Sequence, residues 1–315
     1  MVRSMLAVLL VAVFAVGASA YDFLYTGDTP MTHDAGGFGI GGGIWYLSSD
    51  SYYDCDGEKV GADDFDDDID MSGTQMWIPI HVWYAAMDNL EFGVNAKFGM
   101  LDYEATWEAR DEMTETYEGS GLGDTWIWGK YMFAPDPMVT ARVGVKVNTG
   151  GEPDGGYGAF EDADGDLATG DGQMDVDGAI MFGTEAGPGM FCAAAGYRYR
   201  MDRTVTMDAR DGDSYDLTPG NEIHFQAGYT YYLGDMMNFG IAADGFFGSD
   251  PQADGEAIEY PDGSTLEGMN GVWVNPSFAY MMENGVELGV GFHYPLMGKN
   301  NHAVWGLNAF VGWSM

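Results

Sequence analysis

Apolar and polar side chains alternate along this chain with a period of two residues. The clearest example is residues 139–147, where every second position is apolar and the positions between are Thr, Arg, Gly or Lys. The apolar members are Val139, Ala141, Val143, Val145 and Val147. Successive side chains of a β-strand point to opposite faces. The pattern therefore predicts a strand with one apolar and one polar face.

The same alternation recurs through the chain and predicts about twelve strands. These are residues 36–49, 73–86, 90–106, 121–134, 138–149, 173–184, 190–204, 219–233, 237–249, 268–282, 285–297 and 302–315. Short turns follow the second, fourth, sixth, eighth and tenth of these. The alternate connections are long and polar, at 50–72, 107–120, 150–172, 205–218 and 250–267.

This alternation of connection lengths is typical of outer-membrane barrels, which have short periplasmic turns and longer outside loops. We therefore expect an all-β fold, a transmembrane antiparallel up-and-down β-barrel of about twelve strands. Both of its termini would lie in the periplasm. Eight aromatic residues fall on the apolar faces beside the short turns, as expected of an interfacial girdle. They are Tyr84, Phe92, Tyr131, Phe133, Tyr231, Phe239, Tyr280 and Trp313.

The first residues have the pattern of a secretory signal peptide. Arg3 precedes an apolar stretch, and Ala18-Ser19-Ala20 forms a small-residue cleavage site. We expect cleavage after Ala20, a periplasmic N-terminal segment at 21–35 and the barrel at 36–315, in the bacterial outer membrane. Cys55 falls in a predicted loop and Cys192 in a predicted strand, which favours two unpaired thiols.

The charge of the chain limits its partners. With 12 Lys and Arg against 50 Asp and Glu, the formal net charge is −38. Nucleic-acid binding needs clustered cations on an open face and is not expected. The expected partners are outer-membrane lipid and a small-molecule solute, and the expected state is a monomer.

If the apolar faces meet lipid, the polar faces line the barrel lumen. Half of the basic residues of the chain then point inward: Lys97, Lys130, Arg142, Lys146, Arg198 and Arg200. Inward groups near or across from them include Glu91, Asp124, Asp175, Asp177, Glu222 and His224. One interpretation is a basic strip that guides an anionic solute, whose ring could stack on the inward Trp77, Trp83, Trp126, Trp128 and Trp273. The other is that ion pairs fill a narrow interior, because charged side chains cannot face lipid without cost.

The acidic segment at 161–166 offers a candidate cation site. Asp162, Asp164 and Asp166 alternate there with Ala and Gly, as at the start of a calcium-binding loop. The later bidentate Glu of an EF-hand is missing at the required spacing. A weak Ca²⁺ or Mg²⁺ site and a solvated acidic surface both stay open. We expect no other cofactor.

Several short stretches carry a family resemblance. Gly119-Ser120-Gly121-Leu122-Gly123-Asp124 precedes Gly129-Lys130-Tyr131, then comes Val145-Lys146-Val147-Asn148-Thr149-Gly150, then Thr169-Gly170-Asp171-Gly172-Gln173-Met174-Asp175-Val176, with Gly196-Tyr197-Arg198-Tyr199 after it. This order, over about 119–200, resembles the outer-membrane transporter family named for the MetA pathway of phenol degradation. The resemblance implies a transporter-like barrel, and some members are linked to aromatic-compound catabolism.

Three classes of function follow. The first is a channel for passive passage of small, anionic or aromatic solutes. The second is a non-conducting structural or adhesive barrel whose acidic outer loops bind cations. The third is an outer-membrane hydrolase using a pair such as Ser277 and His293. No nucleophile-elbow pattern surrounds any serine, so we do not expect an enzyme.

Overall fold

The computed structural model describes residues 30–54, 56–61, 69–107, 113–151, 167–207, 213–234, 236–258 and 265–315. The predicted signal peptide, its cleavage after Ala20 and the candidate cation ligands Asp162, Asp164 and Asp166 lie outside these residues. Cys55 does too, so the two unpaired thiols remain a prediction. No helix in the described residues is long and apolar enough to cross a membrane.

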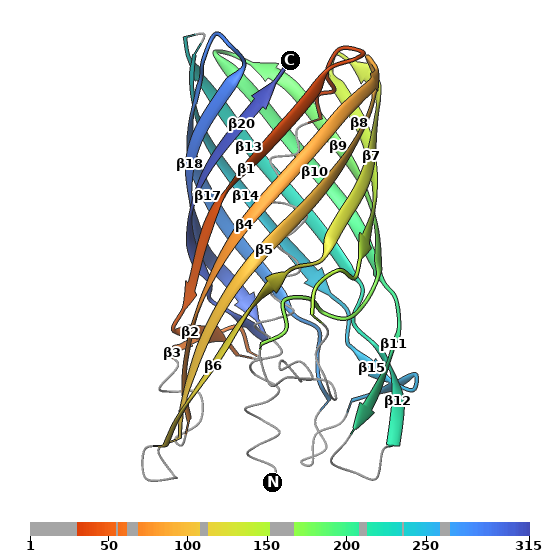
Figure 1. Cartoon of the computed structure of the whole chain (residues 1–315), viewed down its shortest axis with the longest axis vertical. Helices are drawn as coiled ribbons and strands as arrows, with labels where there is room; N and C mark the ends of the chain where they lie inside the picture. The colour runs from red at the N-terminus through yellow and green to blue at the C-terminus, as the bar shows by residue number, and fades with distance from the viewer. Residues whose placement is uncertain are drawn as a thin grey trace.

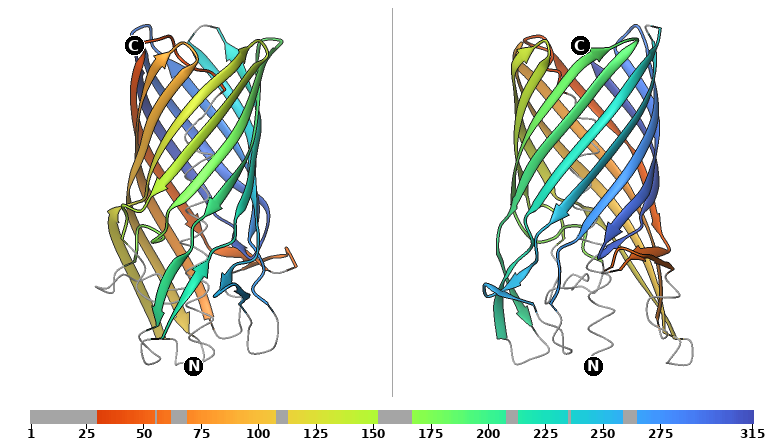
Figure 2. Two further views of the ribbon diagram at one scale, coloured as in Figure 1. Left: turned by 90° about the vertical axis from the view of Figure 1, so that its right-hand side faces the viewer. Right: turned by 180° about the vertical axis from the view of Figure 1, so that it is seen from behind.

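Twelve antiparallel strands form a closed barrel (Figures 1 and 2). In chain order they are β1 (Phe38–Ser49), β4 (Ile69–Met87), β5 (Leu90–Trp107), β7 (Thr125–Pro135), β8 (Met138–Val147), β9 (Asp175–Ala186), β10 (Gly189–Arg200), β13 (Glu222–Leu233), β14 (Met237–Gly248), β17 (Asn270–Met281), β18 (Val286–Lys299) and β20 (Trp305–Ser314). Each strand pairs with the next, and β1 pairs with both β4 and β20. The predicted up-and-down barrel is confirmed, and closure leaves no free sheet edge in the ring.

The two ends of the barrel differ. At the short-turn end, drawn at the top of Figure 1 with the C-terminus, neighbouring strands are joined by tight connections. Gly187, Gly234 and Gly285 have φ of 61°, 75° and 81° there, a region that glycine adopts without steric cost. At the opposite, long-loop end, strands project beyond the barrel. By the connection-length rule the short-turn end faces the periplasm.

The projecting strands lie mostly in segments that were predicted to be long connections. They are β2 (Ser51–Tyr53), β3 (Lys59–Gly61), β6 (Met113–Leu122), β11 (Arg203–Met207), β12 (Asp213–Thr218), β15 (Gln252–Ala253), β16 (Glu256–Ala257) and β19 (Asn301–His302). β19, β2 and β3 form one small sheet, and β11, β12, β15 and β16 form another.

Residues 107–120 contain most of a strand, although they were predicted to be a loop. Met113–Leu122 forms β6 and pairs with β5 from Phe98↔Leu122 to Trp107↔Met113. The predicted strand 121–134 is interrupted at Gly123-Asp124 and divides into β6 and β7. This hairpin extends past the apolar part of the barrel, so it lacks the alternation that revealed the other strands.

The outward face of the barrel wall is apolar and exposed. On β8, Val143 is 59% exposed, whereas its inward neighbours Arg142 and Lys146 are at most 2% exposed. Ile127 and Ile180, on the flanking strands, are 52% and 56% exposed. Among the described residues, no second layer of protein covers this valine row. An exposed apolar surface that encircles the barrel fits only a hydrocarbon environment.

The inward face carries glycines beneath large rings of the neighbouring strand. A Cβ atom at Gly93 would overlap the indole of Trp128, and one at Gly99 would overlap that of Trp77. Gly39 lies in the same way against Trp83. A strand glycine often marks such close approach. The glycines therefore let the tryptophans lie against the wall and leave the centre of the lumen less crowded.

Val143→Arg places a cation on the lipid face near the middle of β8 and should destabilise the folded barrel by about 2–4 kcal/mol. Denaturant titration of the protein in lipid vesicles measures this change. Thr116→Arg is the control, because Thr116 is exposed on β6 beyond the barrel. Equal losses for the two variants would contradict the assignment of the lipid face.

Gly93→Ala forces a methyl group against Trp128 and should cost about 1–3 kcal/mol, the usual range for overpacking. Gly312→Ala is the matched control on β20, because nothing lies within 4 Å of its added Cβ atom. The same denaturant titration compares them. A Gly93→Ala variant as stable as Gly312→Ala would refute the close packing of rings on glycines.

Candidate functional site

The structure places all twelve predicted lumen residues on the inward face. Each is at most 9% exposed: Glu91, Lys97, Asp124, Lys130, Arg142, Lys146, Asp175, Asp177, Arg198, Arg200, Glu222 and His224. Period two fixes this orientation, since a shift by one residue would turn every one of them toward lipid. Their orientation alone does not establish a role in selectivity.

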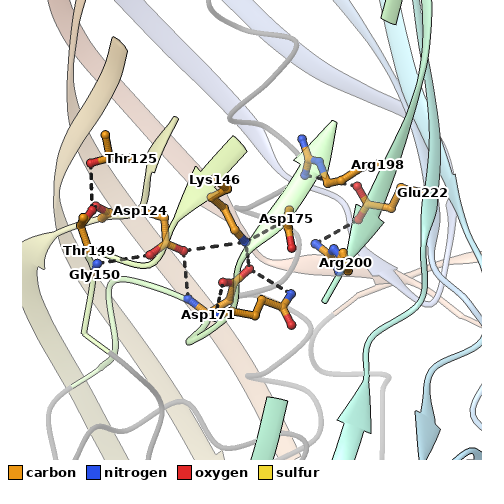
Figure 3. A network of polar contacts seen from close by, with 12 residues as sticks. Asp124, Thr125, Lys146, Thr149, Gly150, Asp171, Asp175, Arg198, Arg200 and Glu222 are labelled. Atoms are coloured by element: carbon orange, nitrogen blue, oxygen red, sulfur yellow. Dashed lines mark hydrogen bonds and ion pairs between the residues drawn. The ribbon is translucent and has the colours of Figure 1, made fainter. Parts of the chain in front are cut away.

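The Lys146 ammonium lies among three carboxylates (Figure 3). Its Nζ atom is 2.8 Å from Asp175 Oδ2 and 3.8 Å from Asp124 Oδ2, and it forms an ion pair with Asp171 Oδ2. Lys146 and Asp175 face each other across the β8–β9 pair. Asp124 lies at the junction of β6 and β7. One cation thus ties two strands, a strand junction and a loop together.

A second set of ion pairs continues around the wall to β13. Arg200 Nη2 is 3.0 Å from Glu222 Oε1, and Arg198 Nη1 is 3.3 Å from Glu222 Oε2. Arg198 Nε also lies 3.9 Å from Asp177 Oδ2, which is 2.7 Å from His224 Nε2. The glutamate therefore bridges two arginines, and the aspartate joins an arginine to a histidine.

We call the charged members of these two sets, with Arg142, the charge belt. Arg142 is within electrostatic reach of both Asp177 and Arg198. The belt contains four cations, Arg142, Lys146, Arg198 and Arg200, and five carboxylates, Asp124, Asp171, Asp175, Asp177 and Glu222. Its formal charge is −1 with His224 neutral. The predicted basic strip is thus neutralised by carboxylates that lie against it.

Asp171 was not among the predicted lumen residues. It belongs to residues 167–173, at the end of the connection from β8 to β9, which we call the docked segment. This segment enters the long-loop end of the barrel, where Leu167, Thr169 and Gln173 are all buried. Burial alone would raise the Asp171 pKa, but Lys146 and Arg200 outweigh it and hold that pKa well below its usual value. The carboxylate is therefore ionised at neutral pH.

Hydrogen bonds hold the docked segment against β6 and the β6–β7 junction. The Leu167 N–H donates to the Glu118 carbonyl at 2.8 Å, and Thr169 Oγ1 donates to the Leu122 carbonyl at 2.8 Å. The Asp171 N–H donates to Asp124 Oδ2 at 3.3 Å. A long polar connection gives no periodic pattern, so sequence reasoning could not place this segment in the lumen.

The short-turn end carries a second inward segment, at residues 30–35. The Pro30 carbonyl accepts a hydrogen bond from Thr140 Oγ1 on β8. His33 stacks on Trp83 of β4 at 3.6 Å between ring centroids, and its Nδ1 lies 2.7 Å from Glu91 Oε2. Residues 30–35 were expected in the periplasm. The structure places them across part of the barrel mouth at the periplasmic end, between β8 and β4.

The remaining two predicted basic residues lie between these ends, over tryptophan rings. Lys97 Nζ is 4.0 Å from the centre of the Trp77 ring, and Lys130 Nζ is 5.7 Å from that of Trp128. Lys130 also lies 3.2 Å from Glu91 Oε1. Such cation–π contacts stabilise a cation removed from bulk water.

The wall formed by β14, β17 and β18 is aromatic rather than basic. Phe246, Trp273 and His293 stack in sequence, with centroids 5.9 Å and 5.4 Å apart. Asn275 donates to Asp244 and lies 2.5 Å from His293 Nδ1. His293 therefore contacts an amide through Nδ1.

Comparison with known proteins supports the fold. The crystal structure of an outer membrane channel from Pseudomonas putida F1 matches at a TM-score of 0.67 with 15% identity, covering 92% of this chain and 98% of that one. The translocator domain of the autotransporter NalP from Neisseria meningitidis matches at 0.49 with 11% identity, covering 95% and 92%. The Ralstonia pickettii toluene transporter TbuX matches at 0.41 with 8% identity, covering 91% and 92%.

The last two TM-scores are too low to define a shared fold, so the first match carries the comparison. No protein-family model matches the chain, and no curated protein matches it. The resemblance to the MetA-pathway family therefore stays a prediction. The closed ring of strands, the exposed apolar face and the structural match together show that the chain is a twelve-stranded β-barrel of the bacterial outer membrane.

Proposed function

We propose that the barrel is a passive channel for small solutes, and that uncharged or aromatic solutes suit it better than anions. The observation that carries this proposal is the inward face, where charged groups are paired with one another and tryptophan rings lie against the wall. The structural match to a protein described as an outer membrane channel supports the general class.

The pairing argues against a filter for anions. Lys130, Lys146, Arg198 and Arg200 each lie within 4 Å of a carboxylate oxygen. Rings of basic residues favour anions when their charge is not compensated. Here the charge belt has a formal charge of −1, so an anion at the belt meets no net positive charge. Of the two interpretations of the basic strip, the geometry favours ion pairs.

The aromatic rings favour a planar apolar solute. Trp77, Trp83 and Trp128 lie over glycines on the inner face of the wall, and Phe246, Trp273 and His293 form a stacked row on another part of it. Aromatic rings prefer offset-stacked or edge-to-face partners. Passage of an aromatic compound would agree with the resemblance to the phenol-degradation family, and both belong to the proposal.

One observation favours the alternative of a structural or adhesive barrel. Two small sheets, β19-β2-β3 and β11-β12-β15-β16, project from the long-loop end and offer folded surface outside the membrane (Figure 1). A purely adhesive barrel would need these sheets and no solute path. Conductance therefore separates the two functions.

Purified protein in planar lipid bilayers should show discrete conductance steps, and proteoliposomes should swell in small uncharged solutes. Replacing both Arg142 and Lys146 by Glu reverses two charges of the belt and should shift ion selectivity several-fold toward cations. Lys59→Glu is the control, because Lys59 is exposed on β3, outside the barrel. Reversal potentials in a salt gradient measure the shift.

Absence of both conductance and swelling would refute the channel and favour the structural barrel. Conductance with unchanged selectivity in the double variant would show that ions bypass the charge belt.

A further inference from the structure

We infer that Asp171 determines the charge preference of the channel, because the docked segment brings its carboxylate into the charge belt. This inference rests on the proposed channel function and names a specificity-determining residue for it. The residue comes from a loop, so selectivity would be set by a part of the chain outside the barrel wall.

The position of Asp171 differs from that of every other member of the charge belt. Arg142 and Lys146 are on β8, and the two belt aspartates of β9, the two arginines of β10 and Glu222 of β13 are also fixed on barrel strands. Asp124 lies at the β6–β7 junction, in the chain that forms the wall. Asp171 alone among the nine reaches the belt from the long connection between β8 and β9, and Figure 3 shows it beside Lys146. Removing its charge therefore leaves every charged side chain of the wall in its place.

The docked segment does not need the charge of Asp171 to stay in place. Leu167 and Thr169 hydrogen-bond to carbonyls of Glu118 and Leu122, and the Gly170 N–H donates to the Gly151 carbonyl at 3.0 Å. Leu167 and Ala168 are also buried, at 3% and 5% exposed. An asparagine at 171 has the same shape as aspartate and keeps an oxygen to accept hydrogen bonds. Asp171→Asn should therefore remove charge while the segment remains docked.

The charge balance gives the sign of the effect. With Asp171 ionised the belt holds five carboxylates against four cations, and without it the numbers are equal. The affected cations are Lys146, which pairs directly with Asp171 and keeps its ion pairs with Asp175 and Asp124, and Arg200, whose charge also acts on Asp171. Charged groups lining a narrow pore set its ion preference. Loss of Asp171 should therefore favour anions.

The test is the reversal potential of Asp171→Asn channels in planar bilayers under a potassium chloride gradient. The permeability of chloride relative to potassium should rise several-fold over the wild type. Asp102→Asn is the matched control. It removes the same charge, and Asp102 is exposed on the outer part of β5. The control should have wild-type selectivity.

A disulfide separates loss of charge from loss of docking. A Cβ atom built at Gly121 lies 3.8 Å from Thr169 Cβ, which is within the range of disulfide-bonded cysteines. Gly121→Cys with Thr169→Cys, in a background with Cys55→Ser and Cys192→Ser, should lock the docked segment to β6. Mass spectrometry with and without reductant verifies the bond.

An equal chloride shift in the locked and unlocked Asp171→Asn channels would support the inference. A shift that disappears in the locked channel would overturn it, because the effect would come from displacement of the segment. Unchanged selectivity in both would overturn it as well, with the channel itself intact. If the wild type failed to conduct, the proposed function would fall first, and the inference with it.

Discussion

The need to pair every backbone N–H and C=O group within the membrane governs this structure. Lipid offers no hydrogen-bond partners, so a sheet that crosses it must close on itself. Here β1 meets that need by pairing with β20 on one side and β4 on the other. Closure in turn divides the side chains of each strand between lipid and lumen. The apolar outward face and the polar interior both follow from this division.

Closure also concentrates charge. Within the membrane, charged side chains on these strands have only the lumen to occupy, and there they lie close together. Lys146 with Asp175, and Arg200 with Glu222, show the result, in which strand neighbours neutralise each other. Removing one partner of a buried ion pair costs more free energy than the pair contributes. Each charged residue of the network therefore limits which residues can replace its partners. In the proposed channel, ion preference would come from small imbalances of charge in this network.

The alternation of apolar and polar side chains predicted much of the fold, because alternate residues of each strand face lipid and lumen. It placed Lys146 and Arg198 correctly on the inward face, and the strand rhythm gave the closed ring. It failed where the chain leaves the membrane. Met113–Leu122 forms β6 beyond the lipid-facing part of the wall, and its sequence has no continuous apolar face. Asp171 was missed for a related reason, since only tertiary contacts bring its loop into the barrel.

The central claim is that odd and even positions of a strand meet lipid and lumen in turn. Nitroxide spin labels introduced singly at positions 141 to 147 of β8 test it by collision with apolar oxygen and a polar nickel complex. We predict high oxygen and low nickel accessibility at 141, 143, 145 and 147, and low oxygen accessibility at the positions between. Accessibility without a period of two, or with the opposite phase, would contradict the account.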